Sequence, residues 1–312
     1  MNFKLNFDIH KSPFNLTYND AFVLLGSCFS DEIGEEIYNA GFNVESNTFG
    51  TIFHPTAIAN LVEASLNESQ SVDFYQRDDL FFSWDAASKI YGTSKDELKV
   101  NVLEARNQFR SKIKNAGVIV FTFGTAWKYE LSSSGKVVGN CHKAPQSLFD
   151  KSLSTIEAMK IDWENVLKLI RKHNPNIKII FTISPVRHIK DGLVENNRSK
   201  SRLIELVNEI LELPNTYYFP SYEILIDELR DYRFYDEDLV HPNKLAVQYI
   251  WERFKEVLFS EETKSILKER EQIVTQLNHK SLHPNSQAET KRKSAVKLRS
   301  EEFKLKYPNI RL

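Results

Sequence analysis

The chain has 312 residues with 41 Lys and Arg against 42 Asp and Glu, so its formal net charge at pH 7 is −1. Hydrophobic residues make up 41% and charged residues 27%, an ordinary composition for a globular protein. The balanced charge argues against a general nucleic-acid binder, and no apolar run approaches the roughly 18–20 residues of a membrane span. Two cysteines are too few for a disulfide framework, and the N-terminus lacks a signal-peptide pattern, so we expect a cytoplasmic protein.

Short apolar runs alternate with longer amphipathic stretches through the first 258 residues. The runs are rich in β-branched and aromatic residues, which is typical of buried strands, and cover residues 22–25, 118–123, 178–183 and 216–219. The amphipathic stretches predict helices over residues 31–40, 55–66, 95–115, 156–173, 193–212 and 243–258. Such alternation is typical of βαβ units and predicts a parallel sheet with helices on both faces.

The charge balance changes after residue 260. Residues 261–312 hold 12 Lys and Arg but only 7 Asp and Glu, a local charge of +5, which leaves −6 on residues 1–260. We therefore predict an α/β domain over residues 1–260 and a charged helical C-terminal extension over residues 261–312. The extension carries apolar residues at near-helical spacing, which favours its packing on the acidic domain over a disordered basic tail; they are Leu267, Ile273, Val274 and Leu277.

Polar residues follow the first apolar run, and in an open α/β sheet ligands bind beyond the carboxyl ends of the strands. Gly26 permits a sharp turn from strand to helix, and Ser30 is a candidate N-cap. Ser27 and Cys28 lie between them, where free amides and the helix dipole favour negative charge. We therefore expect a lowered pKa and a reactive thiolate at Cys28, with a small buried cysteine in a turn as the alternative.

Asp238 and His241 lie three residues apart, just before the last helix of the α/β part. An aspartate that accepts a hydrogen bond from one imidazole nitrogen fixes the tautomer and leaves the other nitrogen to act as a general base. Such a pair alone is also a common loop arrangement. The order nucleophile, Asp, His, with the nucleophile after the first strand, is a more specific indication of nucleophilic catalysis.

Several motifs together resemble the GSCFA family, whose name-giving motif reads Gly-Ser-Cys-Phe-Ser over residues 26–30, with Ser at the last position where the family has Ala. Further similar segments follow in the family's order at residues 47–55, 123–127, 139–143, 182–186 and 238–243, and the likeness spans about residues 20 to 255. The family is similar to the SGNH (GDSL-type) hydrolases. The resemblance implies a three-layer α/β/α fold with a mostly parallel five-stranded sheet in the flavodoxin-like order 2-1-3-4-5.

The SGNH motifs imply roles for individual residues. Counting from the glycine of the first motif places Cys28 at the nucleophile's position, with Ser27 as the nucleophile if the register shifts by one. The Asp-x-x-His motif is intact as Asp238 and His241, the orienting acid and the base. The glycine of the second motif resembles Gly50, whose amide would line the oxyanion hole.

One oxyanion donor is missing from the pattern. The asparagine that donates in the third SGNH motif corresponds to Ala126, a loss on the order of 3 kcal/mol in transition-state stabilisation. Thr125, Asn140 and His142 are candidates to replace this donor. Asn140 and His142 are also candidates for binding the substrate.

The resemblance implies hydrolysis or transfer of the acyl group of a small-molecule or carbohydrate ester, since a thiolate supports both reactions through a thioester. The rival interpretation is a catalytically weak or inactive ligand-binding or interaction protein that retains the fold. We expect no organic cofactor and no metal, because the sequence lacks a phosphate-binding glycine loop and ligand pairs with zinc spacing. We expect no nucleic-acid or membrane partner.

Overall fold

Five parallel strands form the central sheet of the protein. The structure is a computed structural model that describes residues 5 and 7–312. The strands are β1 (Phe22–Gly26), β2 (Val44–Ser46), β6 (Val118–Phe123), β9 (Lys178–Ile183) and β10 (Thr216–Tyr218). They lie in the order β10-β9-β6-β1-β2, and every neighbouring pair is parallel. Read from the β2 edge this is the flavodoxin-like order 2-1-3-4-5, so the predicted sheet is confirmed.

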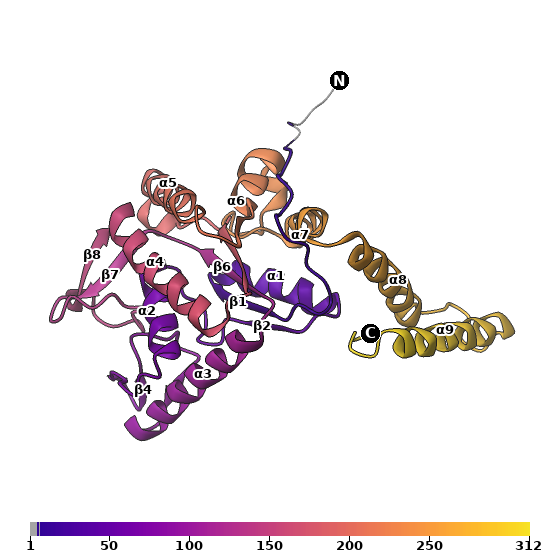
Figure 1. Cartoon of the computed structure of the whole chain (residues 1–312), viewed down its shortest axis with the longest axis horizontal. Coiled ribbons are helices and arrows are strands. Elements are labelled where there is room, and N and C mark those ends of the chain that lie inside the picture. The colour runs from indigo at the N-terminus through magenta and orange to yellow at the C-terminus, as the bar shows by residue number, and fades with distance from the viewer. Residues whose placement is uncertain (1–4, 6) are drawn as a thin grey trace.

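Helices cover both faces of the sheet (Figure 1). One face packs against α2 (Pro55–Leu66), α3 (Lys95–Asn115), α4 (Ile156–His173) and α5 (Leu193–Ile210), and the other against α1 (Cys28–Asn39) and α7 (Lys244–Leu258). Val23 of β1 lies in the first core and Phe22 in the second, because successive side chains of a strand point to opposite faces. Both faces are buried, which is why the strands read as continuous apolar runs.

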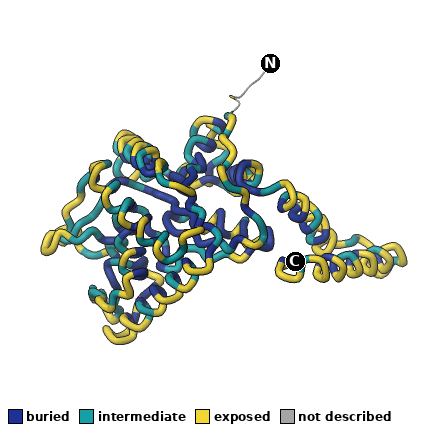
Figure 2. Tube along the Cα trace, viewed as in Figure 1, coloured by how far each residue is buried: buried dark blue, intermediate teal, exposed yellow. Residues whose placement is uncertain are grey.

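Buried residues concentrate along the central strands and the helix faces that meet them (Figure 2). Trp163 of α4 is fully buried, and its ring makes edge contacts with Phe121 and Phe123 of β6 at centroid distances of 4.7 and 4.8 Å. Phe181 of β9 completes this cluster. Much of the aromatic content therefore lies in the core.

The helices α2, α3 and α4 begin and end at the predicted residues, whereas α1 begins three residues before the predicted start. Its N-cap position is held by Ser27, so Ser30 lies inside the helix and its hydroxyl donates to Thr122 Oγ1 instead of capping. The prediction of Ser30 as N-cap is therefore wrong. No helix among residues 5 and 7–312 is long and apolar enough to cross a membrane.

Two insertions interrupt the alternation of strands and helices and were not predicted. One is a small antiparallel sheet of β3 (Tyr75–Arg77), β4 (Leu80–Phe82) and β5 (Tyr91–Gly92), and the other is the hairpin of β7 (Trp127–Leu131) and β8 (Phe149–Leu153). The remaining short elements are turns of helix at Gln146–Leu148, Ile189–Asp191, Ser221–Glu223, Ile224–Leu229 and Tyr232–Phe234. The hairpin follows the end of β6 directly, so it stands beside the carboxyl edge of the sheet.

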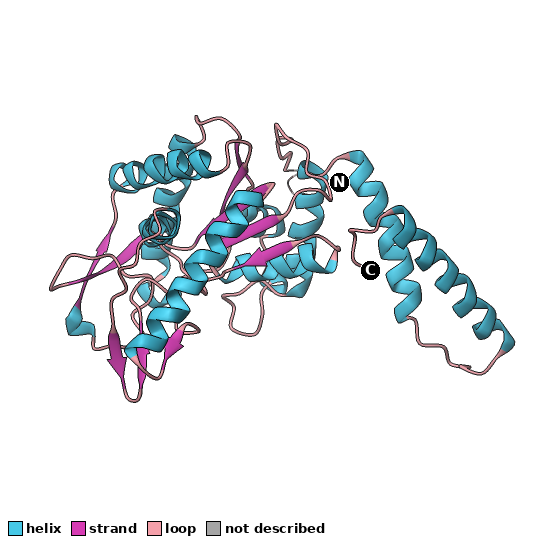
Figure 3. Cartoon of the chain, turned by 60° about the horizontal axis from the view of Figure 1, so that its bottom comes forward, coloured by secondary structure: helices cyan, strands magenta, loops and turns pink. Residues whose placement is uncertain are grey.

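The C-terminal extension forms a hairpin of two helices, α8 (Glu261–Asn278) and α9 (Gln287–Lys306), that projects from the α/β body (Figures 1 and 3). Ile273 and Phe303 are buried in a small cluster of the extension. At the base, Arg270 donates to the carbonyl of Asn39 and Arg311 to that of Tyr38. These carbonyls belong to the end of α1, where the helix dipole favours cations.

Candidate active site

A tight turn joins β1 to α1 and carries the Gly-Ser-Cys motif. Gly26 has φ +149°, and a Cβ there would lie 2.2 Å from the carbonyl oxygen of Thr122, so both the conformation and the space require glycine. The Gly26 amide donates to Asn47 Oδ1 at 2.9 Å, and Asn47 Nδ2 donates to Asp31 Oδ2 at 2.8 Å. Asn47, which follows the end of β2, thus fixes the turn. The sequence did not predict this role, although Asn47 is the first residue of the family-like segment 47–55.

The two candidate nucleophiles of the turn, Ser27 and Cys28, differ in how far they are exposed to solvent. Ser27 is 1% exposed, and its hydroxyl is buried without a hydrogen-bond partner among the described residues. Cys28 is the first residue of α1 and is partly exposed. Of the two residues, Cys28 is therefore the more accessible to solvent.

The environment of Cys28 does not favour its ionisation. Burial raises the pKa of the thiol above its ordinary value, and the carboxylates of Glu32 and Asp31 raise it further. The amides of Phe29 and of Cys28 itself act in the opposite direction. The expected lowering of the pKa by the helix N-terminus is therefore corrected, because desolvation and the acidic first turn outweigh the amides.

Asp238 and His241 form a hydrogen-bonded pair in the loop before α7. Asp238 Oδ2 lies 2.6 Å from His241 Nδ1, while Oδ1 accepts from the amides of Val240 at 2.8 Å and His241 at 3.0 Å. The His241 amide, the His241 ring and the Val240 amide together lower the pKa of Asp238 to about 2. The carboxylate is thus ionised at neutral pH and fixes the imidazole, and about half of each side chain is exposed.

The acidic first turn of α1 connects this pair with the thiol. Glu32 interacts electrostatically with His241, and it also interacts with Cys28. Between residues 7 and 312, no hydrogen bond joins His241 to the side chain of Cys28 or Ser27. Catalytic hydrogen bonds are often long or absent without substrate, so the missing bond does not exclude His241 as the base.

The Gly50 amide is already used within its own turn. It donates to the carbonyl of Asn47 at 2.7 Å, which removes the oxyanion donor that the resemblance implied. The neighbouring segment runs beside the nucleophile, because Ile52 N donates to the carbonyl of Gly26 at 2.9 Å. Thr51 lies between these two bonds, and its amide has no hydrogen-bond partner in the described part of the chain.

Thr125 is also engaged. Its amide donates to the carbonyl of Phe53 at 3.2 Å, its hydroxyl accepts from the Trp127 amide at 3.1 Å, and the same hydroxyl pairs with Ser199 Oγ at 3.0 Å. Thr125 therefore holds the end of β6 against α5, and it is corrected from an oxyanion donor to a structural residue.

His142 is a structural residue rather than a ligand for substrate. It is 1% exposed, and its ring nitrogens bond to Ser88 Oγ at 2.9 Å and to the carbonyl of Ser83 at 2.8 Å. Asn140 Oδ1 accepts from the His142 amide, while Asn140 itself lines a cavity. The expectation for His142 is thus wrong, and Asn140 stays a candidate. No group of three or more His, Cys, Asp or Glu within the described residues could hold a metal ion.

Two cavities flank the loop of residues 185–191, which follows β9. One has a volume of about 300 Å³ and its lining includes Phe53, Trp127, Asn140 and His188. The other has a volume of about 540 Å³, and Asp238 is among its lining residues. Both lie beyond the carboxyl ends of the strands, where ligands bind in open α/β sheets, but neither is lined by Ser27, Cys28 or His241.

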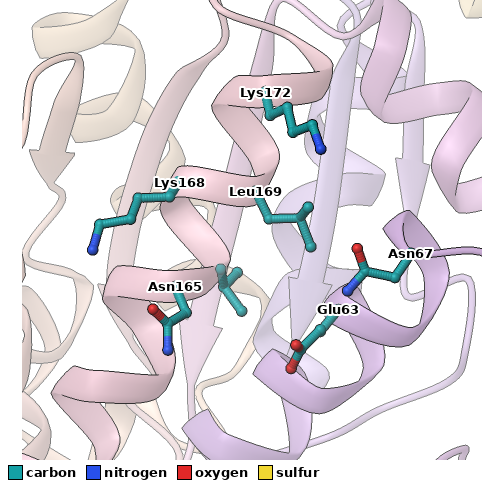
Figure 4. Close-up of a pocket in the computed structure, with 7 residues that line it drawn as sticks. Glu63, Asn67, Asn165, Lys168, Leu169 and Lys172 are labelled. Atoms are coloured by element: carbon teal, nitrogen blue, oxygen red, sulfur yellow. The ribbon is translucent and has the colours of Figure 1, made fainter.

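A further hollow of about 300 Å³ lies between α2 and α4, away from this edge (Figure 4). Glu63 of α2 and Asn67, the residue after the end of α2, line it on one side, and Lys168, Leu169 and Lys172 of α4 line it on the other. It is bounded by two helices on one face of the sheet and shares no residue with the site.

Two charged or titratable residues at the carboxyl edge were missed by sequence reasoning. Lys200 of α5 is 1% exposed, and the pKa of His188 is lowered to about 4, first by burial and then by the charge of Lys200. His188 Nε2 is buried without a partner among the described residues. Lys200 carries no sequence signal, because a lysine on an amphipathic helix is ordinary. The signal for His188 is its place in the polar loop that follows the apolar run of residues 178–183.

His54 predicts a pH dependence of stability. Its Nδ1 accepts from the Thr56 amide at 3.1 Å and so caps α2, while Nε2 lies 2.9 Å from Ser154 Oγ. Burial lowers its pKa from 6.5 to about 3. The stabilisation from the neutral ring is complete above pH 6.5 and is lost as the pH falls towards 3, with a slope of about 1.4 kcal/mol per pH unit. Urea unfolding at several pH values measures the slope, and His54→Asn should flatten it; an unchanged slope contradicts the assignment.

Comparison with known proteins agrees with the family resemblance. The model of the GSCFA family matches residues 21–254, and no curated protein matches the chain. Among solved structures, a carbohydrate esterase family 3 protein from Talaromyces cellulolyticus is similar at 10% identity and a TM-score of 0.37, with 80% of this chain and 99% of that chain covered.

Two further solved structures are similar at the same low level. A family 3 carbohydrate esterase from Clostridium thermocellum has 12% identity and a TM-score of 0.34 over 80% of this chain and 97% of that chain. The acetyl xylan esterase Est2A from Butyrivibrio proteoclasticus has 12% identity and a TM-score of 0.37 over 77% and 64% of the two chains. The family model covers most of the chain, including the turn with Cys28 and the Asp238–His241 pair, and the chain belongs to the GSCFA family.

Proposed function

We propose that the protein is an SGNH-type esterase or acyltransferase in which Cys28 attacks the carbonyl carbon of an acyl ester. The observation that carries this proposal is the Asp238–His241 hydrogen bond of 2.6 Å. The carboxylate holds the proton on Nδ1, so Nε2 is left to accept a proton. The thiol begins the helix at the same edge of the sheet, and the Glu32 carboxylate interacts with both groups.

The proposed reaction uses general-base activation rather than a standing thiolate, because the pKa of the Cys28 thiol is raised. As the sulfur attacks, its proton moves to His241 Nε2. The tetrahedral intermediate then expels the alcohol, which takes that proton from His241, and a thioester remains on Cys28. Water completes hydrolysis, whereas another hydroxyl or amine completes acyl transfer.

Two backbone amides are the proposed donors to the oxyanion. The Cys28 amide lies close to the sulfur, and the Thr51 amide comes from the segment bound to the carbonyl of Gly26. Ala126 has no side-chain donor, and the loss of one donor costs on the order of 3 kcal/mol. We therefore expect slower turnover than in a site with three donors.

The two cavities beside the loop of residues 185–191 offer space for groups of a substrate, and the larger one is lined by Asp238, the partner of His241. Trp127 and Tyr129 give the smaller cavity aromatic walls, and Asn140 adds an amide. The larger cavity includes Arg187 and Asp238.

A panel of acyl esters tests the function. The panel includes p-nitrophenyl esters of increasing acyl length and an acetylated sugar, and each is assayed with wild type and His241→Ala. We expect hydrolysis by wild type, a transient acyl adduct on Cys28 in the intact mass, and a loss of both in the variant. Added alcohols that divert the acyl group would identify transferase activity. Wild type without turnover or adduct on any ester would support the ligand-binding alternative.

A further inference from the structure

The larger cavity at the carboxyl edge, with a volume of about 540 Å³, has an exposed apolar lining. Large hydrophobic side chains that are each more than half exposed gather around it; they are Ile189, Leu193, Tyr232 and Leu239. Hydrophobic residues exposed singly are ordinary in proteins, but a group of them around one cavity is typical of a binding surface. The lining therefore offers apolar surface that a ligand would cover.

Arg187 supplies a fixed positive charge to the same cavity. Its guanidinium carbon lies 4.3 Å from the ring centroid of Tyr235 and 5.3 Å from that of Tyr232. Its Nη1 donates to the carbonyl of Leu239 at 3.4 Å. The two aromatic faces and this carbonyl thus hold the guanidinium against the loop before α7.

The guanidinium has no carboxylate within 4 Å among the described residues. Asp238 lines the same cavity, but its oxygens bond to the His241 ring and to two backbone amides. A guanidinium carries five N–H donors, and the contacts with Leu239 and Tyr235 leave several of them for a ligand. Their planar arrangement matches the oxygens of a carboxylate or a phosphate.

We infer that this cavity binds an amphipathic organic anion. Its carboxylate or phosphate would bond to Arg187, and its apolar body would cover Ile189, Leu193 and Leu239. An anion is favoured because Arg187 is the one cation in the described lining, and the other charged residue there, Asp238, already has partners. That this anion is part of the acyl substrate rests on the proposed function, whereas its binding does not.

Isothermal titration calorimetry with octanoate, octyl phosphate and the neutral octanamide tests the inference. Wild type should bind at least one of the anions about 10-fold more tightly than the amide, because hydrogen bonds between charged groups are the stronger ones. The tighter anion identifies the head group. Arg187→Met should remove the preference for charge. Arg233→Met is the matched control: Arg233 also lies over an aromatic ring, that of Phe234, but it pairs with Asp231 outside the cavity and its loss should change nothing.

A second variant tests the apolar part of the site, also where Arg187→Met does not fold. Leu193 is the exposed first residue of α5, so Leu193→Asp should fold and should weaken octanoate binding about 10-fold or more, through lost apolar contact and repulsion between like charges. Leu245→Asp is its control, because Leu245 is equally exposed in the first turn of α7 and does not line the cavity.

Three results would overturn the inference. They are wild type that binds no anion more tightly than the amide, an unchanged preference for charge in folded Arg187→Met, and unchanged octanoate binding in Leu193→Asp. The titrations need no ester turnover, so a protein without esterase activity still gives a result on this cavity. Ester turnover without anion binding would overturn the inference and leave the proposed function standing.

Discussion

Cys28→Ala is expected to lower ester turnover by at least about 10³-fold, whereas Ser27→Ala should keep most of it. The reason is the difference in exposure within one turn. The Ser27 hydroxyl is buried and has no hydrogen-bond partner among the described residues, so it neither meets a substrate nor connects to a base. The Cys28 thiol begins α1 and is partly exposed. Steady-state kinetics on the ester panel measures both variants.

Thermal melting is the control for this comparison. Ser27→Ala removes a hydroxyl that makes no hydrogen bond, so it should be neutral or slightly stabilising. Cys28→Ser keeps a nucleophile of the same shape and should retain more activity than Cys28→Ala. Activity lost in Ser27→Ala and kept in Cys28→Ala, with both variants folded, would assign the attack to the serine.

The sheet and most helices could be predicted because their signals are local. The strands β1, β6 and β9 are buried on both faces, which produces continuous apolar runs, and α2, α3 and α4 carry a clear helical period. β2 could not be predicted, because its three residues are only partly buried. The hairpin β7–β8 could not be predicted either. All of β7 is only partly buried, and β8, with which it pairs, lies well downstream in the sequence.

The site was predictable where a motif is complete within a few residues. Asp238 and His241 are three residues apart, so the sequence alone indicates their hydrogen bond. The predictions for Gly50 and His142 are wrong because the polar groups of both residues make hydrogen bonds within the fold. Gly50 has a positive φ and its amide bonds within its own turn, and the ring of His142 is bonded in a buried network. The Cys28 pKa failed because the helix N-terminus is visible in the sequence, whereas burial is a property of the tertiary structure.

The burial of Lys200 is another property of the tertiary structure that the sequence does not predict. In the sequence it stands on a polar stretch of α5, which ordinarily faces water. In the structure that turn of the helix lies over the ends of β6 and β9, where two backbone carbonyls accept from the ammonium. A buried charge of this kind is defined by contacts far apart in the chain, and no spacing rule identifies it.

His241→Ala is expected to reduce kcat by about 10²–10⁴-fold, the usual contribution of a general base. Asp238→Asn should approach that loss, because an amide that donates to Nδ1 would favour the wrong tautomer and leave no proton acceptor in place. Both side chains are about half exposed, so neither substitution should change the melting temperature much.

The pH profile and a variant of the neighbouring Asp236 distinguish general-base catalysis by His241 from a general effect of charge in the loop. The pKa of Asp238 is about 2, so its carboxylate stays ionised through the acidic range, and activity lost between pH 7 and about 4 cannot arise from its protonation. Asp236→Asn is the matched control: it removes the same charge from the same loop, but within residues 7–312 no hydrogen bond or ion pair joins its side chain to the His241 ring, so the variant should remain active. Equal losses in Asp236→Asn and Asp238→Asn would mean that the loop acts through its charge alone, and the base assigned to His241 would then have to be another group.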